Sequence, residues 1–483
     1  MPIAATYEVS IAWEAVPDSA FVLDASQLDS AKQLTSQYSG TVGLFEFGYS
    51  TFAAPPAAVP PATAGTDVFG GDFAGLFDSV TNDVKSFTVT RGRTANLDTM
   101  GAGEATIVLH DPTGKYNPLN AASPIAPFVV PGRAVRIAAS YTPSGGAKTT
   151  YPVYYGFVRS IEHNPSPTVK ETRVICQDLF MFLSRAKPLI SNLAGAATTG
   201  RAIGAVLDAI GWTVAAQRNL ATGDSISITW PSADVTGDGN GSTTALDSIQ
   251  KLLLTERGEF FQQANGVVRY ADRYARAKRV SVATLTNVSA ESAPATDLTT
   301  VVNKATVSQQ VSGGPYTKTY TDAVSVSNYG MSDSQAISSY YLNSADQCLQ
   351  LATWLVKQQA LPSSPVRSLA YTANKSDALM VNTLSRELGD RITVADSASG
   401  VTSQDFYVEG IKHEVSNGGL KHQSTFALSK VSSLAPIIFG ASSYTAGQVI
   451  PASRVRTNGE FGSPTVQGST ADTPSTSSNV FAY

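Results

Sequence analysis

Hydrophobic and polar positions alternate most clearly over Tyr151–Asn164, which reads YPVYYGFVRSIEHN. Apolar side chains recur at every second residue up to Gly156, which interrupts the alternation, and resume from Phe157. This period of two is typical of a half-buried β-strand. A glycine inside such a pattern marks a bulge or a close approach of another backbone segment. The pattern therefore predicts a long strand that is broken near its middle.

The same pattern returns at Phe406–Ser416, FYVEGIKHEVS, with Gly410 in the place of Gly156. Its neighbours return in the same order: Gly132–Tyr141 is echoed by Gly389–Ala398 upstream, and Thr172–Leu179 by Gln423–Lys430 downstream. Any two strand–turn–strand segments look partly alike, but three matched elements favour an internal duplication of one small antiparallel β-unit. We expect residues 83–178 and 301–430 to superpose, with the two glycines at equivalent places.

Other stretches complete the strand prediction. Thr6–Trp13 and Asp83–Arg93 alternate, and Gly103–Asn120 contains a strand that ends in an Asp-Pro-Thr-Gly turn. Val267–Tyr274 is a further strand. The Ala/Pro-rich Ala53–Thr66 has too few large apolar residues to pack and is expected to be an extended loop.

Three segments show helical spacing instead. Gly200–Trp212 has apolar residues at i, i+3, i+4 and i+7, and Ser242–Phe261 has a similar face with Gly258 as its stop. A third helix begins at the N-cap Ser344 and ends before Pro362. Its apolar residues are Leu349, Ala352, Trp354 and Leu355.

These elements predict a β-rich α+β protein of several domains, because 483 residues are too many for one core. We expect two related small antiparallel β-barrel domains on either side of an α+β domain, with extended N- and C-terminal segments. The predicted bounds are 1–82 for an N-terminal strand and insertion, 83–189 for the first barrel, 190–300 for the α+β domain, 301–434 for the second barrel with an inserted helix, and 435–483 for a C-terminal arm.

Composition adds little about partners. The formal net charge is −4, but residues 1–83 hold ten acidic groups and one base, Lys32. A solvated acidic face or a complementary partner would explain this asymmetry. Two cysteines, Cys176 and Cys348, are too few for a disulfide framework and are expected in the core. We expect neither a signal peptide nor stable membrane insertion, since the first basic residue is residue 32 and no long apolar run occurs.

Candidate chemistry is sparse. Asp234–Gly241 has the spacing of a calcium loop, but Ala245 stands where the bidentate acid belongs. Arg269–Arg279 interleaves five bases with two tyrosines, which suits either a phosphate backbone or a solvated strand end. We expect Arg269, Arg273, Arg276, Lys278 and Arg279 to face the outside or a neighbouring subunit.

The remaining polar candidates do not form a known catalytic pattern. Glu256 and Glu259 could be paired carboxylates, although an exposed helix end is the expected setting. The four histidines, at 110, 163, 413 and 422, lack metal-ligand spacing, and His163 and His413 are expected in turns or at the surface. The sequence predicts no enzyme, with no catalytic, cofactor-binding or metal-binding residue and no cofactor.

An ordered set of motifs resembles a known family. Val80–Arg93 and Asn96–Asn120 are followed by PGRAVRI and YPVYYGFV, and later by GRAIGAVLDAIGW, ALDSIQKLLLTERGEFF, ELGDRITV and FYVEGIKHEV. This order resembles the minor tail proteins that form the baseplate or tail-tip hub of long-tailed bacteriophages. The resemblance covers roughly residues 80–430. It departs from the usual pattern between Thr6–Trp13 and Asp83–Arg93, which are normally joined more directly, and after residue 434.

The resemblance implies a homotrimeric ring that closes the tail tube and opens for DNA ejection during host cell entry. Its implied partners are the distal tail protein ring, the tape-measure protein and the tail fibre or receptor-binding proteins, with DNA present only in transit. The implied location is the virion tail tip, after assembly in the host cytoplasm. Two alternatives stay open, namely a hub that also degrades cell wall and a secreted carbohydrate-binding β-protein.

Overall fold

A computed structural model describes residues 3–13, 77–94, 98–165, 170–190, 193, 197–228, 243–276, 278–286, 298, 301–309, 316–331, 333, 337–339, 341–362, 368–396 and 401–431. The expected C-terminal arm, most of the N-terminal insertion and the calcium-like loop Asp234–Gly241 lie outside these residues. Within them, no helix combines the length and the apolar character that crossing a membrane requires.

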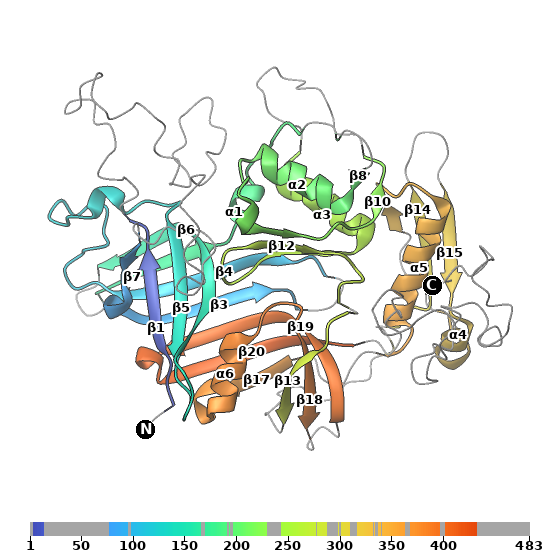
Figure 1. The fold of residues 1–483 in the computed structure, drawn as a ribbon. Helices are drawn as coiled ribbons and strands as arrows, with labels where there is room; N and C mark the ends of the chain where they lie inside the picture. The colour runs from blue at the N-terminus through green and yellow to red at the C-terminus, as the bar shows by residue number, and fades with distance from the viewer. Residues whose placement is uncertain are drawn as a thin grey trace.

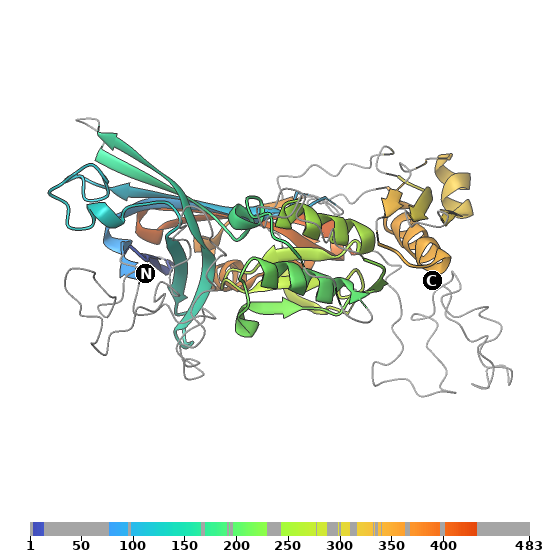
Figure 2. The same cartoon turned by 90° about the horizontal axis from the view of Figure 1, so that it is seen from above.

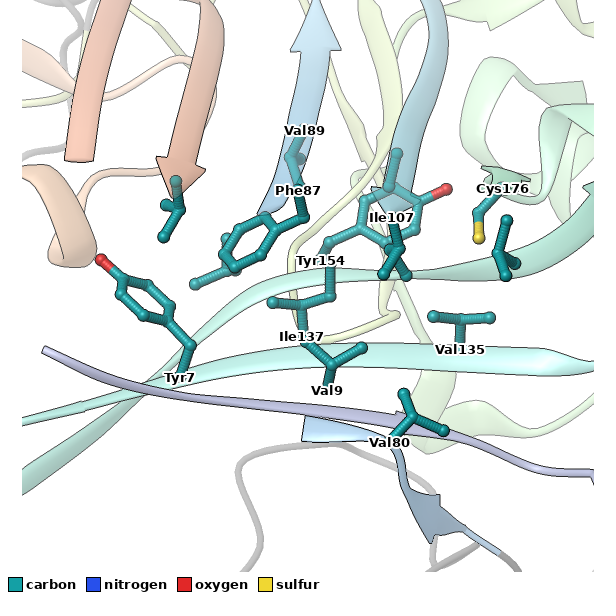
Figure 3. Close-up of a cluster of buried hydrophobic side chains, with 14 of the residues drawn as sticks. Tyr7, Val9, Val80, Phe87, Val89, Ile107, Val135, Ile137, Tyr154 and Cys176 are labelled. Atoms are coloured by element: carbon teal, nitrogen blue, oxygen red, sulfur yellow. The ribbon is translucent and has the colours of Figure 1, made fainter. Parts of the chain in front are cut away.

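The first β-unit is an antiparallel sheet in the N-terminal half of the chain (Figure 1). Its strands are β1 (Thr6–Ile11), β4 (Gly101–His110), β5 (Ala134–Tyr141), β6 (Thr149–Pro165) and β7 (Lys170–Gln177), with the short β2 (Asp78–Ser79) beside β1. They lie in the order β4-β7-β6-β5-β1-β2. Alternate side chains from these strands form one core, in which Val9, Ile107 and Tyr154 lie close together (Figure 3). The predicted strand Thr6–Trp13 thus joins this unit by pairing with β5.

The second β-unit repeats this strand order near the C-terminus. Its strands are β13 (Ser281–Thr286), β17 (Ser368–Thr372), β18 (Arg391–Asp396), β19 (Val401–Ser416) and β20 (Lys421–Lys430). They lie in the order β17-β20-β19-β18-β13, which matches β4-β7-β6-β5-β1 position by position. The outermost pairs differ, because β13 is parallel to β18 whereas β1 is antiparallel to β5.

One further strand, β3 (Val84–Gly92), joins the two units. It pairs with β4 on one side and with the second half of β19 on the other, so that twelve strands form one sheet. Figure 1 shows the blue strands of the first unit continuing into the orange strands of the second. The described strands form one open sheet and do not close into a barrel, so the expected pair of barrels is not present in their pairing. The reason is that β3 and β19 pair with each other, and each unit thereby extends the sheet of the other.

Backbone hydrogen bonds place the two units in a common register. The N–H of Gly132 donates to the carbonyl of Val158 at 2.7 Å, and the N–H of Gly389 donates to the carbonyl of Val408 at the same distance. Both glycines have a positive φ, 88° and 76°. Because each opens the strand that precedes the long strand, the predicted echo of Gly132–Tyr141 by Gly389–Ala398 is present in the structure.

Both long strands also carry a β-bulge at the same place. The β6–β7 register shifts between Val158 and Ser160, which leaves Arg159 as the extra residue. The β19–β20 register shifts between Val408 and Gly410, which leaves Glu409 as the extra residue. The two units therefore share strand order, register and bulge.

The expected equivalence of the two glycines is wrong. In the common register Gly410 corresponds to Ser160, while Gly156 lies before the bulge and pairs with Val135. Each glycine instead marks a close approach. A Cβ on Gly156 would lie 2.3 Å from the hydroxyl oxygen of Tyr154, and one on Gly410 would lie 2.6 Å from a backbone carbonyl oxygen, that of Arg93.

The middle region packs helices over a small sheet. Its elements are α1 (Phe180–Leu183), α2 (Thr199–Ala209), α3 (Ala245–Glu256), β8 (Ala197–Thr198), β9 (Arg218–Leu220), β10 (Ser225–Ile226), β11 (Glu259–Gln262) and β12 (Val268–Ala271). The two predicted helices of this region are confirmed as α2 and α3, capped by the hydroxyls of Thr198 and Thr244. Their apolar faces share a core with Phe157 of the first β-unit, so this region packs on that unit.

A separate lobe occupies the chain between β13 and β17. It consists of β14 (Lys304–Gln309), β15 (Thr317–Thr321), α4 (Ala323–Tyr329), β16 (Ile337–Ser339) and α5 (Ala345–Gln359), with a core of its own. Figure 2 shows it at one end of the molecule. Ser344 caps α5 as predicted, by accepting from the N–H of Gln347. Leu349, however, is 40% exposed and lies outside the buried face of α5, which Leu351, Leu355 and others form, while Trp354 is partly buried against that core.

The second repeat therefore does not fill residues 301–430. Four of its strands, from β17 to β20, lie within residues 368–430, and the fifth, β13, precedes the separate lobe. Helix α6 (Asp377–Ser385) links β17 to β18. The remaining helical segments are the 3-10 turns η2 (Thr81–Asp83), η3 (Ala126–Phe128), η4 (Ala215–Gln217), η6 (Ala373–Lys375) and η7 (Asn417–Gly419).

Candidate functional site

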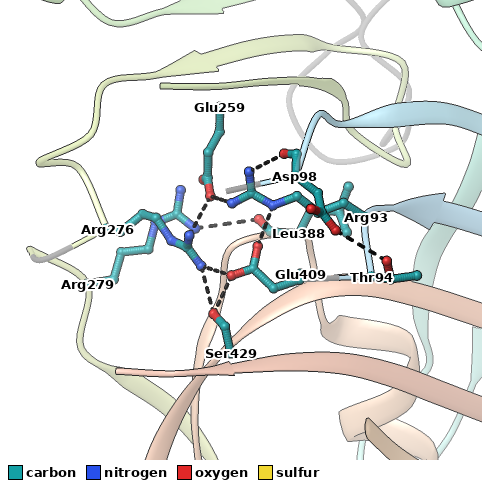
Figure 4. Close-up of polar contacts among 9 residues, drawn as sticks. All are labelled: Arg93, Thr94, Asp98, Glu259, Arg276, Arg279, Leu388, Glu409 and Ser429. Carbon is teal, nitrogen blue, oxygen red and sulfur yellow. Dashed lines mark hydrogen bonds and ion pairs between the residues drawn. The ribbon is translucent and has the colours of Figure 1, made fainter. Parts of the chain in front are cut away.

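Four buried charged side chains meet where both β-units and the middle region come together; we call Arg93, Glu259, Arg276 and Glu409 the charge junction (Figure 4). Arg93 contacts Glu259 and Glu409 at nitrogen–oxygen distances of 3.0 and 2.8 Å. Arg276 contacts Glu259 at 3.0 Å and also pairs with Glu409. Each arginine thus bridges both carboxylates.

Local structure explains why these four residues converge. Arg93 follows β3, Glu259 opens β11, and Arg276 lies in the turn after β12. Glu409 is the bulge residue of β19, and the bulge directs its side chain to the place where these three segments meet. The junction is therefore built by elements that lie far apart in the sequence.

The two arginines determine the charge state of the buried carboxylate of Glu409. Burial by itself would raise the pKa of Glu409, but Arg276 and Arg93 act against it and lower the pKa to about 2. The hydroxyl of Ser429 donates a further hydrogen bond to Glu409. Breaking a buried pair by removing one partner typically costs about 3 to 5 kcal/mol, because the other charge is left uncompensated. The junction can hold three parts of the chain in a fixed arrangement.

Two further ion pairs surround the junction. Arg91 of β3 contacts Glu387 at 2.6 Å, and the second oxygen of Glu387 accepts from the N–H of Ala264 at 2.9 Å. Arg273 contacts Asp224 at 2.7 Å. These contacts link β3 to the second unit and fasten the middle region internally.

A buried chain of polar rings lies at another contact between the units. The hydroxyl of Tyr7, from β1, lies 2.6 Å from Nδ1 of His422, whose Nε2 lies 3.0 Å from Nδ1 of His413. Burial lowers the pKa of His422 to about 4. Burial, then His422 and Arg91, hold the pKa of His413 well below its usual range. Both imidazoles are therefore neutral at pH 7.

The expectation that His163 and His413 lie in turns or at the surface is wrong for His413. His413 is 3% exposed, within the pairing of β19 and β20. In the common register it corresponds to His163, which bonds Thr172 and is partly buried in β6. Cys176 and Cys348 are buried, as predicted.

The expected exposed helix end around Glu256 and Glu259 is also wrong, because both are at most 2% exposed. Glu256 accepts from the hydroxyl of Tyr270 at 2.7 Å and from the N–H of Asp224 at 3.0 Å. Glu259 belongs to the charge junction. The two carboxylates have different partners and do not form a pair.

The basic stretch Arg269–Arg279 differs from its prediction in a similar way. Arg273 and Arg276 are 3% and 9% exposed and form ion pairs inside the chain rather than facing outward. Arg279 is half-buried against Leu388, whereas Lys278 is exposed. Within the described residues, no group of three or more His, Cys, Asp or Glu side chains could hold a metal ion.

Sequence patterns gave little indication of the charge junction. Arg93 and Glu409 are separated by 316 positions, and the motifs that contain them give no sign that their side chains pair. The one available signal was the glycine-interrupted strand, which indicated a bulge near Glu409 but not the direction of its side chain.

Solved structures of tail proteins are similar to this chain at low sequence identity. No known protein-family model matches the sequence, and no curated protein matches it. The tail protein from Neisseria meningitidis MC58 is 13% identical with a TM-score of 0.47, covering 74% of this chain and 94% of its own. The 43 kDa tail protein of prophage MuSo2 from Shewanella oneidensis is 14% identical with a TM-score of 0.47, covering 74% and 96%. Prophage tail protein gp18 from Listeria monocytogenes EGD-e is 13% identical with a TM-score of 0.42, covering 73% and 90%.

Proposed function

We propose that this chain is a structural hub protein of a phage tail tip or baseplate. In this role three copies form a ring that closes the tail tube, connects it to the proteins beyond it, and opens for DNA ejection. The proposal is in line with the names of the tail proteins above but takes its support from the sequence motifs and from the duplicated β-unit.

The observation that carries the proposal is the repeat itself. Two units with the same strand order, register and bulge lie in one chain. Three such chains around an axis would present six similar β-units. A trimer could then contact a six-fold ring through equivalent surfaces, because closed assemblies repeat the same contact at each symmetry position.

The charge junction suits a protein that transmits mechanical force. A hub must transmit force between tail and fibres without its parts sliding apart. Arg93, Glu259, Arg276 and Glu409 connect β3, the middle region and the second β-unit by side chains that are almost fully buried. Burial protects these pairs from screening by salt, which would weaken the same contacts at the surface.

The proposed partners are the distal tail protein ring and the tape-measure protein on one side, and the tail fibre or receptor-binding proteins on the other. The two related β-units would form the inner ring as barrel-like modules completed by neighbouring copies. DNA would pass through the bore without a stable complex. We place the protein at the tail tip of the virion after assembly in the host cytoplasm.

The proposal assigns no catalytic role to any residue. Glu256 accepts from Tyr270 and Glu259 pairs with Arg93, so the two carboxylates are engaged separately. This favours a purely structural protein over a hub that also hydrolyses cell wall. A zymogram on peptidoglycan tests that alternative, and clearing by the purified full chain would support a hub with hydrolase activity. A glycan array tests the secreted carbohydrate-binding alternative.

Electron microscopy of intact particles tests the proposal directly. Particles that contain the chain would be labelled with an antibody against an exposed segment such as residues 144–150. The proposal predicts label only at the end of the tail. Label on the capsid or along the tail tube, or its absence from particles, would contradict the proposal.

A further inference from the structure

A small cavity lies beside the charge junction. Its volume is about 50 Å³, and its lining includes four arginines together with Met100 and Trp354; we call it the guanidinium pocket. The arginines are Arg93, Arg257, Arg273 and Arg276. It is formed where the segment after β3, the end of α3 and helix α5 of the separate lobe approach one another. A cavity of this size accommodates a few water molecules or one small polar group.

Three of these arginines already have carboxylate partners, and Arg257 differs from them. Arg93 and Arg276 share Glu259 and Glu409, and Arg273 contacts Asp224. In the part of the chain that the structure describes, no ion pair includes Arg257, and its buried Nε has no hydrogen-bond partner. Burial lowers the pKa of Arg257, without a carboxylate to oppose that effect. The guanidinium of Arg257 is therefore the one arginine side chain of the pocket lining for which the described residues give no ion pair, although Asp98 also lines the pocket.

The backbone of Arg257 is also unusual. It adopts the left-handed conformation, with φ 59° and ψ 33°, at the C-cap of α3. Glycine is the usual residue there, because a side chain costs about 1 kcal/mol or more in this conformation. The glycine that the sequence offers is the next residue, Gly258, where a Cβ would lie 2.8 Å from the carbonyl oxygen of Ala271. Backbone strain of this kind is concentrated at binding sites.

We infer that the guanidinium pocket binds a carboxylate of a partner polypeptide, presented beside an apolar residue. The planar fork of Arg257 matches a carboxylate, and one guanidinium without an ion pair matches one carboxylate rather than a chain of phosphates. Asp98 also lines the pocket, and Glu259 and Glu409 lie behind it, so these acids repel a chain of several phosphates more strongly than a single carboxylate. Met100 and Trp354 offer apolar walls for the neighbouring residue. The inference goes beyond the tail role and does not depend on it.

Calorimetry with small probes tests the site on the full-length chain. The probes are the capped dipeptide acetyl-Leu-Glu-amide, its acetyl-Leu-Gln-amide counterpart, and sodium phosphate. We expect saturable binding of the glutamate dipeptide only. Arg257→Gln should weaken that binding at least tenfold, whereas Arg173→Gln, which changes an exposed arginine of β7, should leave it unchanged. Equal binding of both dipeptides, no binding of either, or binding of phosphate alone would overturn the inference.

Two further measurements locate the site and separate binding from folding. The glutamate dipeptide should change tryptophan fluorescence in the wild-type chain but not in Trp354→Phe, because Trp354 lines the pocket. Arg257→Gln should melt at or above the wild-type temperature, since it removes a half-buried charge that has no ion pair among the described residues. A fluorescence change that persists in Trp354→Phe, or a variant Arg257→Gln that melts well below wild type or does not fold, would assign Arg257 a structural role and contradict the inference.

Discussion

The two β-units use the same bulge for different purposes. In the first unit the bulge residue is Arg159, which is exposed and faces Glu104 across 3.3 Å at the surface. In the second unit the bulge residue is Glu409, which is fully buried and bonded to Arg93 and Arg276. The backbone geometry is common to both, while the charge and the surroundings of the side chain are opposite.

This difference shows how a duplicated unit can be joined to its copy. A bulge twists its strand and redirects one side chain without changing the rest of the ladder. At Arg159 the redirected side chain points to solvent, where an ion pair contributes at most about 1 kcal/mol. At Glu409 it points to where three segments meet, and burial makes the same kind of contact far stronger. Position in the assembly of elements, rather than the bulge, determines what the residue does.

The largest expected change in stability comes from neutralising the buried bulge residue Glu409, with the exposed bulge residue Arg159 as the matched control. Glu409→Gln should lower the free energy of unfolding by about 3 to 5 kcal/mol, because the two buried arginines Arg93 and Arg276 are left with only one carboxylate, that of Glu259. Arg159→Gln should change it by less than about 1 kcal/mol. Guanidinium unfolding followed by circular dichroism measures both. Equal losses in the two variants would show that Glu409 has no special role in stability.

The second test concerns the antiparallel pairing of β3 with β19. A Cβ on Gly92 would lie 2.2 Å from the carbonyl oxygen of Glu409, and the φ of Gly92 is 92°. Gly92→Ala should therefore cost about 3 kcal/mol by forcing the two strands apart. Gly145→Ala is the matched control, because Gly145 also has a positive φ, 74°, but no atom lies within 4 Å of its Cβ position.

Gly145→Ala should cost only about 1 kcal/mol, the conformational penalty alone. Thermal melts of the two variants separate the contributions. If Gly92→Ala melts no lower than Gly145→Ala, β3 and β19 do not approach each other closely at Gly92. That result would contradict the continuous sheet.

The third test concerns His422, the buried histidine of β20 that contacts His413. The folded-state pKa of His422 is about 4, below its unfolded value near 6.5, so the unfolded chain binds more protons between these values. Stability from this group is complete above pH 6.5 and is lost as the pH falls toward 4. From pH 7 to pH 5 the loss should be about 2 kcal/mol. His422→Gln should remove that component of the pH dependence.

Guanidinium unfolding of wild type and His422→Gln at pH 5, 6 and 7 measures this component. A wild-type slope that His422→Gln leaves unchanged would mean that other groups dominate acid sensitivity in this range.

The sequence revealed the elements of the fold better than their assembly. Local periodicity was sufficient for α2, α3 and β6, since amphipathic spacing reflects burial of one face. The repeat was visible because Gly132 and Gly389 open equivalent strands. Its glycine alignment failed because a bulge needs no glycine: Arg159 and Glu409 occupy the bulges, and Gly156 is required by the packing of Tyr154 instead.

The charge junction could not be predicted from the sequence for a different reason. Glu259 and Arg276 are polar residues near helix and strand ends, and such residues are usually solvated. Only tertiary pairing of β3 with β19 places Arg93 beside Glu409 and closes the junction. Long-range strand pairing leaves no local pattern, so neither the single sheet nor its buried charges had a sequence signal.

The most direct test of the hub account is an averaged cryo-electron microscopy reconstruction of the tail end. It should contain three copies of this chain around the tail axis, with their six β-units forming one ring at similar radius against the adjoining tail ring. A reconstruction with one copy, with six copies, or with the second β-unit away from that ring would contradict the account.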